Sequence, residues 1–135
     1  MISKTIGFIL SVVLIVWVSW TCKDDLVDPG PVDIVFPDSG VSYGTHVQPL
    51  FDRACAFIGC HAGETPQRDL SLESYQKATE RVGIIVPYDP DGSILVQAIE
   101  GIAPNTRRMP LFRSPLTDNQ IKGIRTWIKE GALPN

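Results

Sequence analysis

Two cysteines and a histidine stand close together near the middle of the chain, at Cys55, Cys60 and His61. Two thiols followed directly by an imidazole suit covalent haem attachment, in which each sulfur adds to a haem vinyl group and the histidine becomes an axial ligand of the iron. The usual spacing has two residues between the cysteines, whereas this chain has four. The motif alone leaves two alternatives: a local disulfide in an exported protein, or a zinc site completed by His46 or acidic residues.

A second candidate ligand is Met109, the only methionine besides Met1. A lone methionine usually fills space in a core, but this one lies between Arg108 and Pro110 in a stretch that does not resemble core. A thioether is suited to the sixth coordination position of a haem iron, where it raises the reduction potential. Guanidinium groups match carboxylates in geometry, so Arg107 and Arg108 are candidates to pair with haem propionates.

The other histidine and three aromatic residues have simpler interpretations. His46 is an alternative axial ligand, although we expect it to face solvent. Trp127 is expected to pack against the first helix or the haem edge, and Tyr43 and Tyr75 are expected in the core or around the haem. None of these residues carries a catalytic prediction.

The elements that must position these residues are short helices joined by long loops. Apolar spacing predicts a first helix over residues 45–56, and a second candidate covers 71–80. Ser93 and Gly101 bracket a third helix over 94–99. A capping box beginning at Thr117 opens the last helix, which extends to about residue 130. The β-branched stretch 82–86 allows at most one small strand, so the expected class is all-α.

The sequence of the N-terminal part predicts that the protein is exported. Lys4 precedes an almost unbroken apolar run over residues 6–20, which is shorter than the roughly 20 residues of a membrane-spanning helix. Cys22 directly follows, as in the lipobox of bacterial lipoproteins, so residues 1–22 are expected to be an export signal with Cys22 lipidated. An uncleaved anchor and ordinary cleavage are the alternatives, and all three place the remainder outside the cytoplasmic membrane.

Residues 23–42 contain three prolines and five aspartates without helical periodicity, which predicts a flexible acidic tether. The alternative is a strand over 32–36 that packs on the domain. The domain itself is expected over residues 43–135. The chain has 135 residues and a net charge of −3, so it holds one ordinary domain, and the absence of a basic stripe argues against nucleic acid as a partner.

From Tyr43 onward the chain resembles the small single-haem cytochrome c domains of environmental bacteria, including those described as planctomycete-type cytochrome c. The resembling segments are residues 47–51, 60–61, 69–72, 75, 85–87, 89–93, 108–110, 116–117 and 121–132. The resemblance implies a cytochrome c-like fold of three to five short helices around one covalent haem c. It also implies thioether bonds from Cys55 and Cys60, with His61 and Met109 as axial ligands.

These expectations favour a membrane-tethered electron carrier of the periplasmic side of the envelope, exchanging single electrons with protein partners, rather than an enzyme. Two axial protein ligands would leave the iron no open position for a substrate. The alternatives are an enzyme or gas sensor with an open haem site, and a disulfide-stapled lipoprotein module without haem.

Overall fold

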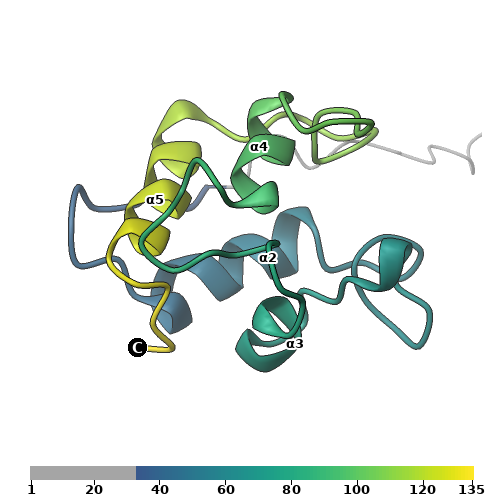
Figure 1. Cartoon of the computed structure of the whole chain (residues 1–135), viewed down its shortest axis with the longest axis horizontal. Helices are drawn as coiled ribbons and strands as arrows, with labels where there is room; N and C mark the ends of the chain where they lie inside the picture. Colours follow the sequence, from purple (N-terminus) through teal and green to yellow (C-terminus); the bar gives the residue numbers. More distant parts are fainter. Residues whose placement is uncertain (1–32) are drawn as a thin grey trace, which may run out of the picture.

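The computed structural model of the protein describes residues 33–135, so the expected export signal, Cys22 and the first part of the expected tether lie outside the described residues. Over 33–135 the chain forms four short α-helices joined by long loops, with no β-strand (Figure 1). This confirms the expected all-α class. In the same range, no helix combines the length and the apolarity needed to cross a bilayer.

The first helical segment begins slightly earlier than the apolar spacing predicts. A π-helical turn, η2 (Tyr43–Val47), continues into α2 (Gln48–Ala54). The Ser42 hydroxyl accepts a hydrogen bond from the Thr45 amide at the start of η2, which satisfies a free helical donor. Because α2 ends at Ala54, the two candidate thiols come directly after it.

Two further short helices follow, α3 (Tyr75–Thr79) and α4 (Ile94–Glu100). Gly101 closes α4 in the left-handed conformation, at φ 82°, as the sequence predicts. Ser93 precedes α4, but its side chain does not cap the helix. Its hydroxyl instead accepts from the Val86 amide at 2.9 Å and donates to the Asp89 carbonyl at 2.8 Å.

The stretch 82–86, expected to allow a small strand, forms turns instead. The described residues offer it no neighbouring strand, so its β-branched side chains have no sheet in which to pack. Ile84 and Ile85 are buried in the core, whereas Val82 is fully exposed. The loop is therefore held by burial and by the Ser93 hydroxyl rather than by a strand ladder.

The last helix, α5 (Asp118–Lys129), supplies much of the core. Its capping box is complete: the Thr117 side chain accepts from the Gln120 amide, and the Gln120 side chain accepts from the Thr117 amide. Trp127 is buried beside Tyr43, with ring centroids 5.4 Å apart, and Tyr43 meets Tyr75 edge to face at 5.1 Å. These contacts confirm the expected packing of Trp127 against the first helix.

Residues 33–42 pack against α5, which differs from the expected free tether in this part of the chain. Phe36 is buried, and its amide and carbonyl are both hydrogen-bonded to the Asn119 side chain. Further along, the Glu130 carboxylate accepts from the Gly40 and Val41 amides. Burial of the Phe36 side chain and hydrogen bonding of the backbone thus stabilise the packed segment against the repulsion expected between its aspartates. The alternative that this segment packs on the domain is supported, although without a strand.

Candidate functional site

A cavity of about 590 Å³ lies where the loop after α2 and the loop after α4 come together. Both loops lie on the same side of the molecule, away from the C-terminal end of α5 (Figure 1). The volume falls within the range of about 300–1,000 Å³ that is usual for small-molecule and cofactor sites. Five of the six residues expected to bind a cofactor line it: Cys55, Cys60, His61, Arg107 and Met109.

The cysteine loop folds back on itself, so that the second cysteine and the histidine return toward the first. The His61 amide donates to the Cys55 carbonyl at 3.2 Å, and the Cys60 amide donates to the Phe57 carbonyl at 2.9 Å. The additional length bulges outward at Ile58, which is 92% exposed, and Gly59 takes a positive φ of 84°. Both cysteines are free thiols, so each sulfur is available for another bond.

The ring of His61 is held by the backbone. Its Nδ1 lies 3.1 Å from the Leu70 carbonyl oxygen. Because that oxygen can only accept, Nδ1 carries the proton, and the lone pair remains on Nε2. A backbone hydrogen bond of this kind commonly fixes the tautomer and the ring orientation of a metal-binding histidine.

Burial distinguishes the two thiols. Cys55 is half-buried against the core, whereas Cys60 is exposed. Burial raises the pKa of the Cys55 thiol to about 12, with a further rise from nearby Cys60 and an opposing effect of Arg113. Cys55 is therefore a neutral thiol at physiological pH.

Met109 is half-buried, packs against the core and faces the same cavity as His61. Its amide donates to the Ala98 carbonyl at 2.9 Å, which ties this part of the loop to the end of α4. The interpretation of Met109 as a simple core filler is therefore incomplete, because the residue also lines a cavity that contains two thiols and an imidazole.

Arg108 does not line the cavity, contrary to the expectation that it faces a cofactor. Its Nε donates to the Ile99 carbonyl at 3.1 Å, near the C-terminal end of α4. The last carbonyls of a helix lack partners within the helix, so a guanidinium there satisfies an otherwise free acceptor. The side chain also lies close to Gly101. Arg108 thus stabilises α4 rather than the cavity.

Two arginines that the sequence did not single out line the cavity instead. Arg68 donates to the Asn105 carbonyl at 3.2 Å, which joins the two loops. The Arg113 guanidinium lies over the Phe57 ring, 4.2 Å from its centroid, which joins them a second time. Only their positions in the folded loops distinguish these residues, so no local pattern could have identified them.

The alternative ligands find no support in the geometry. His46 does not line the cavity: its Nδ1 accepts from the Ser42 amide at 3.1 Å, and its half-buried ring lies 5.7 Å from that of Phe36. Among residues 33–135, no group of three or more His, Cys, Asp or Glu side chains is placed to hold a metal ion. A haem needs no such group, because the porphyrin supplies the iron's other ligands.

A scan against protein-family models, a search of curated proteins and a search of solved structures each found no match to this chain. Any functional assignment therefore depends on the cavity and on the residues that line it.

Proposed function

We propose that this chain is a haem-binding domain of the cytochrome c-like class. More specifically, it is a mono-haem c-type cytochrome, tethered to the membrane, that carries single electrons between redox proteins of the cell envelope. The observation that carries the proposal is the convergence of Cys55, Cys60, His61 and Met109 on one cavity. When bound, haem c supplies a one-electron couple at its iron.

The donor set suits this cofactor. Cys55 and Cys60 would hold haem through thioether bonds: each thiol would add across one vinyl group, its hydrogen passing to the other vinyl carbon with no atom lost. The half-buried Cys55 sulfur and the exposed Cys60 sulfur provide one attachment at the core and one at the rim. Neither step needs an oxidant.

The axial ligands are a nitrogen and a soft sulfur. The Leu70 carbonyl holds the proton of His61 on Nδ1 and leaves Nε2 as the ligating atom. Met109, which lines the same cavity, would supply a thioether ligand, and a thioether favours the ferrous state. With both ligands in place, the site transfers electrons without binding a substrate at the metal.

The arginines of the cavity suit the haem propionates. Arg107 was the sequence-based candidate, and Arg68 and Arg113 line the same cavity. Guanidinium groups bind carboxylates through charge-assisted hydrogen bonds. At least one of the three is expected to pair with a propionate, whereas Arg108 is already bonded to α4.

The absorption spectrum of the protein, produced in a host with haem-attachment machinery, tests this proposal. We expect a six-coordinate, low-spin spectrum in both oxidation states. Met109→Ala should retain the haem but open the sixth position, so that added imidazole binds without displacing a ligand. His61→Ala should abolish a stable low-spin haem.

An unchanged spectrum and reduction potential in Met109→Ala would contradict the sixth-ligand assignment. A five-coordinate spectrum in the unaltered protein would favour the open-site enzyme or sensor. A colourless protein with Cys55 joined to Cys60 would favour the stapled module.

A further inference from the structure

The mouth of the cavity carries positive charge without carboxylate partners. Arg68, Arg107 and Arg113 all line the cavity, and none of them takes part in an ion pair among the described residues. The lining contains no Asp or Glu from residues 33–135, and Asp69, next to Arg68 in sequence, lies outside it. Pairing with two propionates would still leave one of the three charges uncompensated.

This local charge opposes the charge of the whole chain, which is −3. At physiological ionic strength, exposed charges interact over about 8–10 Å, so an approaching molecule responds to nearby groups more than to the net charge. The arginines therefore predict attraction of anions at the mouth, whereas the net charge alone predicts repulsion.

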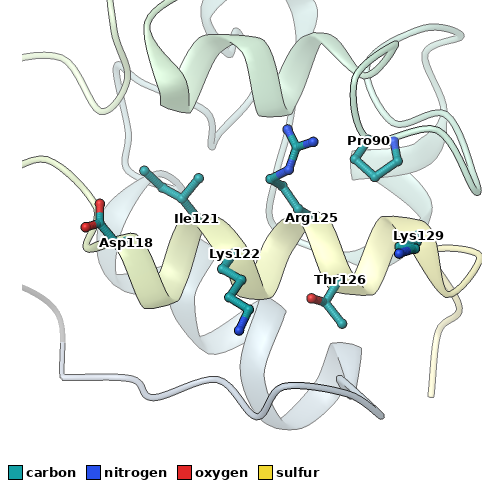
Figure 2. Close-up of a pocket in the computed structure, with 7 residues that line it drawn as sticks. All are labelled: Pro90, Asp118, Ile121, Lys122, Arg125, Thr126 and Lys129. Carbon is teal, nitrogen blue, oxygen red and sulfur yellow. The ribbon is translucent and has the colours of Figure 1, made fainter.

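A second group of basic side chains lies on α5, and two of its three members are paired with carboxylates. Lys122, Arg125 and Lys129 line an open depression of about 360 Å³ on α5 (Figure 2). Arg125 is paired with Asp91 and, at 3.0 Å, with Glu100. Lys122 is paired with Asp38 at 2.7 Å, and Asp118 lines the same depression. The depression on α5 therefore serves as the surface with which the charge at the mouth of the cavity is compared.

Exposed apolar side chains accompany the arginines at the mouth. Ile58 is 92% exposed and Phe112 is 91% exposed. Phe112 lines the cavity beside Arg113, whereas Ile58 lies at its edge, between Phe57, which contacts Arg113, and Gly59, which lines the cavity. Small ions gain nothing from apolar groups, whereas protein interfaces typically have an apolar centre with a polar rim.

Building on the proposed function, we infer that the mouth surface, formed by Ile58, Arg68, Arg107, Phe112 and Arg113, docks the acidic surface of a redox protein partner. Complementary charge steers the encounter, and the apolar side chains exclude water from the contact. Such encounters bury little area and dissociate quickly, which suits a carrier that must release its partner after transfer.

Mapping by NMR with hexacyanochromate(III), a paramagnetic anion that exchanges no electron with the protein, tests the charge. In the reduced holoprotein, amide signals near a bound anion broaden. We expect broadening around residues 57–60, 68 and 105–113 to exceed that along α5 by roughly threefold or more, and to fall as salt is added. Broadening that is centred on α5, or spread evenly, would overturn the inference.

Two charge-reversal variants provide a matched comparison. Arg107→Glu should weaken the broadening at the mouth, whereas Lys129→Glu, the same change of charge on α5, should leave it unaltered. Equal effects of the two variants would show that net charge governs the interaction, and the inference would fail.

Reduced flavodoxin, an acidic redox protein, distinguishes a protein-docking surface from a site for small anions. Mixed with the reduced holoprotein, it transfers no electron, so shifts of the amide signals report binding alone. Ile58→Ser should raise the Kd for flavodoxin about threefold to tenfold and leave hexacyanochromate binding unchanged. Val35→Ser, an exposed apolar control distant in sequence, should alter neither. Anion binding without flavodoxin binding at the mouth would overturn the docking proposal.

The failure of this inference is separate from the failure of the proposed function. A haem-containing protein with no anion preference at its mouth would contradict only the docking surface. A protein that attaches no haem would contradict the proposed function, and with it the redox partner.

Discussion

At the scale of single residues, the two thiols occupy different environments although they belong to one motif. Cys60 is exposed at the rim, whereas Cys55 is half-buried against the core, and its pKa is raised to about 12, chiefly by burial. Thiolates are the reactive form of cysteine. Before haem is attached, Cys60 is therefore the more accessible nucleophile.

Alkylation of the haem-free protein measures this difference. With iodoacetamide at pH 8, we expect Cys60 to react more than about tenfold faster than Cys55, since the thiolate fraction falls tenfold for each unit by which pKa exceeds pH. In Cys60→Ser, the rate at Cys55 should still rise with pH above the range of an ordinary thiol, because burial, the chief cause of the raised pKa, remains. Mass spectrometry of the alkylated peptides provides the readout.

Unfolding in urea is the control, because it should make the two thiols react at similar rates. Equal rates in the folded protein would show that Cys55 is not protected as the structure describes.

At the scale of elements, the Arg113–Phe57 contact links the loop that carries Met109 to the loop that carries the thiols. Phe57 lies between the two cysteines, so the segment that joins them provides a contact between the two sides of the cavity. A cation–π contact of this kind contributes about 0.5–1 kcal/mol at an exposed site.

If Met109 is the sixth ligand, as we propose, loss of the Arg113–Phe57 contact should loosen it. Phe57→Ala should increase the rate at which imidazole displaces Met109 about twofold to fivefold, because the loop opens more readily. Lys129→Ala removes a positive charge from α5, outside both loops, and is the control. Stopped-flow absorbance measures both rates, and identical rates in Phe57→Ala and the unaltered protein would refute the role of the contact.

A second prediction concerns the packing of residues 33–42 on α5. A Cβ added at Gly123 would collide with the Phe36 side chain. Gly123→Ala should therefore lower the free energy of unfolding by about 1–3 kcal/mol, despite the better helix propensity of alanine. Urea unfolding measures the change.

Two comparisons test whether the collision with Phe36 causes the loss of stability. Gly44→Ala meets only ordinary contacts and should be nearly neutral. Adding Gly123→Ala to Phe36→Gly should cost little more than Phe36→Gly alone, because every Phe36 side-chain atom that the new Cβ would meet is gone. A full additive cost would show that the two sites are independent.

Local sequence signals predicted the helices well because caps and apolar spacing act within a few residues. The Thr117 capping box and the Gly101 terminus are of this kind. The sequence left open at most one small strand over 82–86, and none forms because a strand needs a neighbour, which is a property of the whole fold. The sequence indicated packing of segment 33–42 only as an alternative to a tether, because the residues that satisfy its backbone, Asn119 and Glu130, lie far along the chain.

The candidate site was likewise predictable only in part. The sequence motif predicted which residues could bind a haem, and the fold brings Cys55, His61 and Met109 to one cavity. The sequence motif could not predict the direction in which a loop side chain points. Arg108 turns toward the Ile99 carbonyl, whereas Arg113, four residues after Met109, turns to the cavity.

At the scale of the whole molecule, the proposed membrane attachment is predicted to depend on Cys22, which lies outside the described residues. If a lipid on Cys22 provides the attachment, Cys22→Ser should move the protein from the membrane fraction to the soluble fraction, because the acyl chains supply the buried apolar surface. Immunoblots of separated fractions measure this. Retention of the variant in membranes would indicate that the apolar run over residues 6–20 holds the chain instead.

The central claim is that one haem is attached covalently through both Cys55 and Cys60. The alkaline pyridine haemochrome spectrum of the purified protein tests it most directly, because the position of the reduced α-band depends on how many vinyl groups have been converted to thioethers. We predict the band position of a doubly attached haem c, shifted to the singly attached position in both Cys55→Ala and Cys60→Ala. A band typical of unmodified haem, or no band at all, would contradict the account.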